Sequence, residues 1–373
     1  MPVNRSTSFR IAICAIAIWS LLTVGLRPGP AAAAEAAADL HQLETAVAAA
    51  LLERRESVQI DYTGDGQELS GRIKDVIMDA LKRDDYTSYI VDSYFYSIRK
   101  LSGRSHIRLT LNYRETLAQT AEVDRKVREV LDRLITPEMN DHQRVKVIHD
   151  WIVLRLAYDV GLNRYTAYEA LRTGKAVCQG YALLAYKMFN AAGIPARIVE
   201  GAVPESDHAW NLVRVGGRWY HLDVTWDDPV PDRGGAVSYD YYLKTDEEMR
   251  KDHTWTREYP RADTPYEAAV REAKQTDPAR AGFYDSLEAA LGWKWLRPEH
   301  TAATADELRR KMEEAAASGA DGFKVRYLRG DAVRTDLQKA AAEIKAAGIR
   351  AYEASILPFG DDGAVLVEVS LIR

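Results

Sequence analysis

The sequence predicts a protein of the α+β class, because helical and strand-like segments occur in separate runs instead of alternating regularly. Stretches with an apolar residue at every third or fourth position, typical of helices, precede stretches in which apolar and polar residues alternate, typical of half-buried strands. Gly216 and Gly217 lie between two such strands, as expected for a two-residue hairpin turn. The 373 residues, of which 47% are apolar, are enough for two or three domains.

Residues 1–34 have the pattern of a Sec-type signal peptide. Two arginines precede an apolar run over residues 11–26, and four alanines offer A-x-A cleavage sites before Glu35. The run is shorter than a membrane-spanning helix needs. We therefore expect an exported protein, secreted or held in the cell envelope, with an uncleaved N-terminal anchor as the alternative. Cleavage would remove Cys14 and leave Cys178 as the single thiol.

Residues 35–116 are expected to form a small module with the element order α-β-α-β-β. Its helices are predicted at 40–54 and 69–82, and its strands at 57–62, 89–99 and 105–113. Residues 305–373 repeat this order, with helices at 305–317 and 335–347 and strands at 323–327, 351–357 and 364–372. The modules are either a divergent duplication or two uses of a common element order. Neither contains a recognisable catalytic cluster, so binding or packing is their expected role.

The central domain, residues 117–262, is expected to open with two helices. The second is predicted to start at Thr136, where a capping residue precedes Pro137 at the first helical position. The later elements are predicted as a short helix at 166–171, a helix at 178–190, and strands at 196–203, 208–215 and 218–225. Residues 263–304 are expected to form a helical linker to the C-terminal module.

Cys178 lies where a loop turns into a helix, which is a favourable position for a nucleophile. The unpaired N–H groups of a helix N-terminus carry partial positive charge, which favours a thiolate and can hold a developing oxyanion. Exported proteins usually pair their cysteines. A solitary cysteine is therefore an inert buried residue, a leftover or a working nucleophile.

His208 and Asp223 are expected to meet across the hairpin. If Gly216 and Gly217 form the turn, His208 pairs with residue 225, and Asp223 lies two positions away on the same face of the sheet. Backbones at that diagonal are roughly 7–8 Å apart, a gap that the two side chains can close. A carboxylate there would orient the imidazole, and a helix N-terminus could bring Cys178 to it, which gives a thiol, a base and an orienting acid.

With these residues the sequence resembles the transglutaminase-like superfamily. The resemblance rests on Val177-Cys178-Gln179-Gly180-Tyr181, His208-Ala-Trp210-Asn211 and Leu222-Asp223-Val-Thr-Trp226-Asp227, with weaker matches at 146–159 and 241–255. It covers about 140 residues and leaves both flanking modules out.

The resemblance implies a papain-like core, with the helix-borne cysteine packed on an antiparallel sheet, and acyl transfer through a Cys178 thioester with His208 and Asp223. Trp210, Trp226 and Tyr181 are expected to wall the site or bind substrate, with buried packing as the alternative for the tryptophans.

An acyltransferase or amide hydrolase acting on protein or cell-envelope peptide, including cell-wall peptide, is the favoured function. A cysteine peptidase and a non-catalytic adhesion or scaffold protein with a vestigial site are the alternatives. No cofactor or metal is expected, and the net charge of −5 argues against nucleic acid as a main partner. Membrane contact is expected only through an uncleaved signal segment.

Overall fold

The structure is a computed structural model that describes residues 34–101, 103–230, 237–344, 349–359 and 362–372. These residues form two compact units, which divide between Ala269 and Val270. All but the last residue of the predicted signal peptide, 1–34, lies outside the described residues. No helix within the described ranges combines the length and the apolar character that a membrane span needs.

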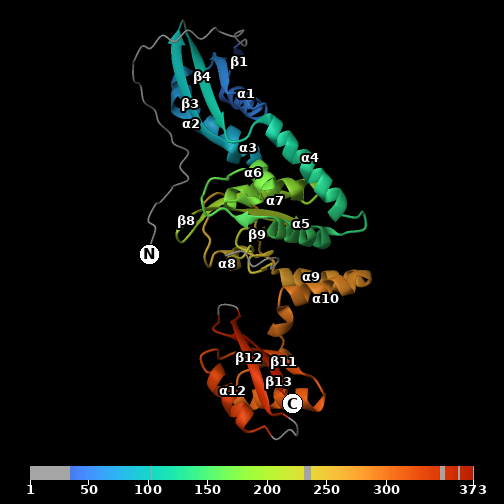
Figure 1. Cartoon of the computed structure of the whole chain (residues 1–373). Coiled ribbons are helices and arrows are strands. Elements are labelled where there is room, and N and C mark those ends of the chain that lie inside the picture. Colours follow the sequence, from blue (N-terminus) through green and yellow to red (C-terminus); the bar gives the residue numbers. More distant parts are fainter. Residues whose placement is uncertain (1–33, 102, 231–236, 345–348, 360–361, 373) are drawn as a thin grey trace. The chain divides into compact units, whose positions relative to one another are not determined.

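The first unit begins with an α+β module (Figure 1). Its elements are β1 (Glu35–Ala37), α1 (Leu40–Leu52), β2 (Ser57–Tyr62), α2 (Gly66–Lys82), α3 (Asp85–Ile90), β3 (Val91–Leu101) and β4 (Arg104–Tyr113). The five expected elements occur in the expected order, and β1 and α3 are added to them. Residues 89 and 90, which the sequence assigned to a strand, instead end α3, because the Asp84 side chain caps this helix by accepting from the Thr87 N–H at 2.7 Å.

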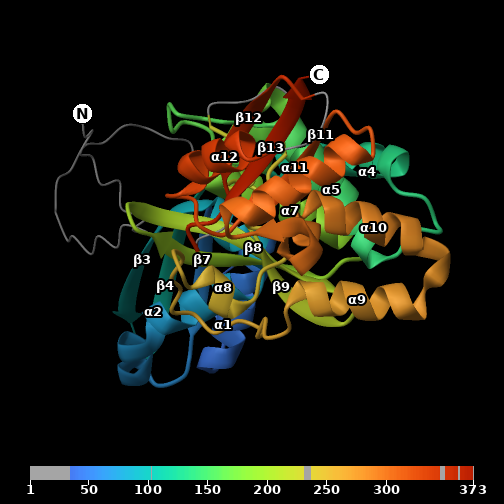
Figure 2. The same cartoon turned by 90° about the horizontal axis from the view of Figure 1, so that it is seen from below.

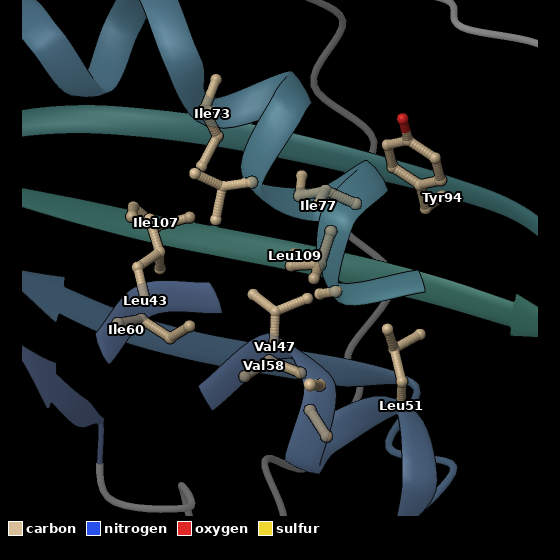
Figure 3. Close-up of a cluster of buried hydrophobic side chains, with 14 of the residues drawn as sticks. Leu43, Val47, Leu51, Val58, Ile60, Ile73, Ile77, Tyr94, Ile107 and Leu109 are labelled. Atoms are coloured by element: carbon tan, nitrogen blue, oxygen red, sulfur yellow. The ribbon is translucent and has the colours of Figure 1, made fainter. Parts of the chain in front are cut away.

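Helices α1 and α2 enclose the core of this module against one face of its sheet, as Figure 3 shows. The strand order is β1-β2-β4-β3, with β1 parallel to β2 and the other pairs antiparallel. Alternate residues of β2 and β4 point into the core, including Val58, Ile60 and Leu109, and they meet Val47 and Ile77 of the helices. The opposite face of the sheet is largely exposed, as the period of two predicts.

The central domain follows in the same unit (Figure 1). It consists of α4 (Leu117–Leu134), α5 (Asp141–Arg155), β5 (Ala157–Tyr158), α6 (Ala167–Thr173), β6 (Lys175–Ala176), α7 (Cys178–Ala191), β7 (Ala196–Val203), β8 (Ser206–Val215), β9 (Arg218–Leu222) and α8 (Asp246–Met249). The antiparallel sheet β7-β8-β9 carries α7 against β8, so the chain has the α+β character that the sequence predicts.

One predicted helix start in this domain is wrong. Helix α5 begins at Asp141, and Thr136 lies in the connection before it. Asn140 and Gln143 form a capping box, in which each side chain accepts from the backbone N–H of the other residue. This pair satisfies two N–H groups at the helix end, whereas a threonine before Pro137 offers only the favourable φ of proline.

The hairpin register is as expected, but its second strand is shorter. Gly216 and Gly217 form the turn with φ of 56° and 83°, and Val215 pairs with Arg218. Strand β9 ends at Leu222, so the expected pair between His208 and residue 225 does not form. Asp223 therefore follows the end of the strand instead of lying inside it.

The second unit contains the rest of α9 (Tyr266–Thr276), followed by η1 (Pro278–Arg280), α10 (Ala281–Ala290), η2 (Trp293–Leu296) and η3 (Pro298–His300). Its sheet module comprises β10 (Thr301–Ala302), α11 (Ala305–Ala317), β11 (Gly322–Tyr327), α12 (Val333–Ala342), β12 (Ala351–Pro358) and β13 (Val365–Ile372). Helices α11 and α12 share one hydrophobic core with the sheet, and Figure 2 shows both helices beside its strands. The helix predicted at 335–347 ends at Ala342, and residues 345–348 lie outside the described residues.

The two sheet modules have the same topology. The strand order β10-β11-β13-β12 repeats the order β1-β2-β4-β3, with a short parallel strand at one edge and a hairpin at the other. Each module also places one helix before and one after its second strand. This shared plan agrees with either a duplication or a common supersecondary order, the two alternatives that the sequence left open.

Candidate functional site

Cys178 is the first residue of α7, and the backbone before it is held on both sides. Strands β5 and β6 pair in parallel, with Tyr158 opposite Ala176, and the Val177 N–H donates to the Arg164 carbonyl at 2.9 Å. Two positions after the cysteine, a Cβ on Gly180 would lie 2.7 Å from the Ala176 Cβ. Glycine is therefore needed for the first turn of α7 to pack this closely on β6.

The N-terminus of α7 has no side-chain cap. Its N-cap is Val177, whose side chain has no oxygen that could accept from the first N–H groups of the helix. The side chain of Gln179, the residue after the cysteine, donates to the Tyr89 carbonyl of α3 at 2.6 Å. The N-terminal module thus holds the residue that follows the cysteine.

The structure brings Cys178, His208 and Asp223 together. His208 on β8 donates through Nε2 to the Asp223 Oδ2 at 2.6 Å, and its ring also shares a hydrogen bond with the Cys178 side chain. Burial works to lower the pKa of His208, but the Asp223 charge and both hydrogen bonds outweigh it and raise this pKa to about 10. His208 is therefore protonated at neutral pH and faces the sulfur as a cation.

Asp223 is a fully buried carboxylate with a complete set of donors. Its Oδ1 accepts from the backbone N–H groups of Thr225 and Trp226 at 2.9 and 3.2 Å. Burial alone would raise the pKa of Asp223, yet the charge and hydrogen bonds of His208 and His253 lower it far below its usual value. Asp223 thus stays ionised, as an orienting acid must.

His253 is a site residue that the sequence analysis did not single out. Its Nε2 lies 3.2 Å from the Asp223 Oδ2, which is the oxygen that His208 also contacts. Its Nδ1 lies 2.6 Å from the Asp252 Oδ1. The only signal for it was its position in the weaker downstream match, since 30 residues separate it from Asp223.

The side chains of His208, Asp223 and His253 each offer one potential metal-ligand atom, and these atoms all lie within 4.8 Å of one another. Their spacing is instead that of hydrogen bonds. Nitrogen and oxygen ligands of one tetrahedral zinc ion lie about 3.3 Å apart, given bonds of about 2.0–2.1 Å. An ion would have to push His208 away from Asp223, to which it now lies at 2.6 Å.

Of the three aromatic residues predicted to wall the site or bind substrate, only Trp226 is partly exposed. Its ring lies 5.8 Å from that of His208. Trp210 is 1% exposed and stacks on His208 at 5.9 Å, while its Nε1 donates to the His221 Nδ1. Tyr181 is fully buried and donates to Asp228 at 2.5 Å. Trp210 and Tyr181 therefore support the site from behind and do not form an accessible wall.

Another buried histidine, His149, supports the turn that carries Asp223. The His149 Nε2 lies 3.0 Å from the Asp227 Oδ2, and its Nδ1 lies 3.0 Å from Asp150. Burial raises the pKa of Asp227 to about 6, although the contact with His149 opposes this. The Asp227 N–H donates to the Asp223 carbonyl at 3.2 Å. This cluster ties α5 to the turn and so fixes the backbone of Asp223.

Tyr158 is a further residue near the sulfur. Burial raises the pKa of its phenol to about 12, and the charges of Cys178, Tyr165, Asp159 and Asp223 add to this. Tyr158 on β5 pairs with Ala176 on β6, and Ala176 lies two residues before Cys178. The phenol keeps its proton at neutral pH and is available as a hydrogen-bond donor.

The site retains limited access to solvent. Cys178 and His208 are each 6% exposed, which leaves the sulfur neither open nor sealed. The chemistry that fits these residues is attack by a thiolate on a carbonyl carbon, with a protonated imidazole beside it and a helix start that no side chain caps.

The central domain is similar to known proteins. Residues 128–224 match the model of the transglutaminase-like superfamily. Kyphoscoliosis peptidase of Mus musculus is 31% identical over 133 residues, which are 31% of this chain and 20% of that protein. The Homo sapiens protein of the same name is 31% identical over 122 residues, which are 28% of this chain and 18% of that protein.

This chain therefore spans about a fifth of the length of these curated relatives. A crystal structure of a TGase is similar with a TM-score of 0.28 and 15% identity, over 46% of this chain and 51% of that chain. The family match covers the segment that carries Cys178, His208 and Asp223. Residues 128–224 are therefore a transglutaminase-like segment, and members of this superfamily are usually cysteine enzymes.

Proposed function

We propose that this protein is an exported, thiol-dependent acyltransferase or amide hydrolase that acts on protein or cell-envelope peptide through a thioester on Cys178. One observation carries the proposal. A cysteine at the uncapped N-terminus of α7 shares a hydrogen bond with His208, whose Nε2 is held by the buried carboxylate of Asp223 at 2.6 Å. Three such groups from separate elements have the roles of nucleophile, proton carrier and orienting acid.

In the first half of the reaction the Cys178 thiolate attacks the carbonyl carbon of an amide, and a C–S bond forms. The N–H groups at the start of α7 and the Tyr158 phenol would stabilise the oxyanion that develops. The C–N bond then breaks, and His208 gives its proton to the departing ammonia or amine. Asp223 holds the imidazole in place throughout.

In the second half, the neutral His208 takes a proton from water or from an amine that attacks the thioester. The C–S bond breaks, and Cys178 leaves as the thiolate beside the re-protonated imidazole. Water yields a carboxylic acid and completes hydrolysis, whereas an amine yields a new amide and completes transfer. Both outcomes use the same acyl-enzyme.

Export and domain roles belong to the same proposal. The signal-like pattern of residues 1–34 supports secretion or retention in the cell envelope, where protein and peptide substrates are available. The boundaries proposed are 35–116 for the N-terminal module, 117–262 for the transglutaminase-like domain, 263–304 for a helical linker and 305–373 for the C-terminal module.

The test uses a glutamine-containing peptide, a tagged primary amine and the full chain, followed by mass spectrometry. Addition of the amine with loss of ammonia indicates transfer, and conversion of glutamine to glutamate indicates hydrolysis. Cuts in the peptide backbone would favour the alternative of a cysteine peptidase; the curated relatives are named as peptidases. Cys178→Ser is the control and must abolish each product.

Thiol labelling tests the site without a known substrate. We expect iodoacetamide to label Cys178 rapidly near neutral pH, because a thiolate beside an imidazolium reacts faster than an ordinary thiol. His208→Ala should slow this labelling. Equally slow labelling of the wild-type and His208→Ala proteins would contradict the proposal and support a scaffold protein with a vestigial site.

A further inference from the structure

Two imidazoles share one oxygen of Asp223. The Nε2 atoms of His208 and His253 lie 2.6 and 3.2 Å from the Asp223 Oδ2, and their rings are 5.4 Å apart. All three side chains are buried, and His253 is fully so. This arrangement adds a fourth residue to the nucleophile, base and acid, because the Asp223 carboxylate contacts two imidazoles instead of one.

The second nitrogen of His253 continues the chain of contacts outward. Its Nδ1 lies 2.6 Å from Asp252, whose carboxylate is about one-third exposed and also accepts from the Tyr241 hydroxyl at 2.5 Å. Acidic and imidazole groups thus alternate from Asp252 through His253, Asp223 and His208 to the sulfur. A histidine that only filled space among aromatic rings would not need a carboxylate at each nitrogen.

We propose that His253 is a positioning residue of this site, which shares the Asp223 carboxylate with His208 and so limits how tightly that carboxylate holds the His208 proton. The inference rests on the proposed function, in which His208 must release its proton to the leaving group.

The physical reason is competition for one acceptor. A carboxylate oxygen that accepts two N–H groups binds each less strongly than it would bind either alone, because its charge is divided. Without His253, the buried Asp223 Oδ2 would be compensated by His208 alone. His208 would then keep its proton to higher pH and act as a poorer acid.

The groups that face His253 are consistent with this role. Asp252 and Asp223 are in direct contact, and His208, His221 and Tyr241 are the other titratable groups near its ring. Trp226 and Trp210 cover the ring at centroid distances of 4.6 and 5.0 Å. The two carboxylates therefore dominate the electrostatic surroundings of His253.

The experiment measures the rate of Cys178 alkylation by iodoacetamide from pH 5 to 11 in the full chain. We compare the wild-type protein with His253→Phe, which removes the donor, and His253→Gln, which keeps a neutral donor. His142→Gln is the matched control, since His142 is also buried but contacts Tyr266 instead of Asp223.

We expect His253→Phe to move the alkaline limb of the profile upward by about 0.5 pH unit or more, since a lost charged contact typically has effects of this size or larger. His253→Gln should restore at least half of the shift, and His142→Gln should leave the limb unchanged. An unchanged or lowered limb in folded His253→Phe overturns the inference. Slow wild-type labelling instead overturns the proposed function.

If His253→Phe does not fold, NMR of ¹⁵N-histidine-labelled wild-type protein tests the same coupling. Alkylation of Cys178 changes the charge beside His208, and a shared Asp223 carboxylate must transmit this change to the His253 ring. We expect the His253 Nε2 signal to shift on alkylation and the His142 signals to stay in place. A His253 signal that does not respond overturns the inference.

Discussion

Replacing Asp85 with asparagine should loosen the joint between the N-terminal module and the strand next to the site. Asp85 begins α3, and its buried carboxylate accepts from the Arg197 Nε and Nη2 on β7 at 2.6 and 3.1 Å. It also accepts from the Ile198 N–H at 3.1 Å and lies 3.4 Å from Arg257. Four donors therefore converge on one side chain.

The size of the effect follows from burial. Breaking a fully buried ion pair costs about 3–5 kcal/mol, because the remaining charge has no partner. The Arg197 side chain is 38% exposed, so water can compensate part of its charge, and asparagine still accepts one hydrogen bond. We expect a loss of about 2–3 kcal/mol in the free energy of unfolding. In a unit of this size that corresponds to a drop of about 4–12 °C in Tm.

Urea unfolding and calorimetry measure this loss, and iodoacetamide labelling measures its effect on Cys178. Labelling should also slow, because the same helix α3 holds Gln179 through the Tyr89 carbonyl. Asp79→Asn is the control, since Asp79 pairs with Lys82 on the surface and should change stability by less than about 0.5 kcal/mol. A loss of less than about 0.5 kcal/mol in Asp85→Asn, no larger than a surface ion pair gives, would refute the reasoning.

Three further outcomes are expected. The pKa of His208 is raised from 6.5 to about 10, so the stability that protonated His208 contributes is complete below pH 6.5 and is lost as the pH rises to about 10. In urea titrations, the difference in unfolding free energy between wild type and His208→Gln should shrink over this range. A constant difference would contradict the ion pair between His208 and Asp223. Tyr158→Phe should slow thioester formation on Cys178 by about 10- to 1000-fold while the fold stays intact, if the phenol holds the oxyanion; an unchanged single-turnover rate would exclude this role. Gly201→Ala should destabilise the protein by about 2 kcal/mol or more in calorimetry, because its Cβ would lie 2.1 Å from the Thr254 carbonyl oxygen, and an unchanged Tm would mean that the neighbouring strands adapt freely.

Elements with strong periodicity are predicted well from the sequence. Strand β2 and helix α11 have the expected bounds, because Ser57–Tyr62 alternates regularly and Ala305–Ala317 carries one apolar stripe. Errors occur where two local signals compete. Thr136 with Pro137 and Asn140 with Gln143 are both acceptable helix starts, and only the reciprocal hydrogen bonds of the second pair decide between them.

Some residues of the site could also be predicted from the sequence. A lone thiol at a helix start and a hairpin register are local features, and they led to Cys178, His208 and Asp223. The position of Tyr158 could not be predicted in this way, because a two-residue strand such as β5 has no period. The wall expected from Tyr181 fails for a related reason, since its place in the sequence does not reveal that its hydroxyl donates to Asp228 inside the core.

Local order and residue chemistry thus predicted which three groups are suited to act on a carbonyl, and they placed Cys178 at a helix start and His208 on a strand. Packing settled everything that depends on distance through space: that His253 divides the Asp223 carboxylate with His208, that α3 holds Gln179, and that Trp210 lies behind the site. The reason is physical. Secondary structure follows from interactions a few residues apart, whereas burial and charge contacts arise only when distant segments exclude water from one another.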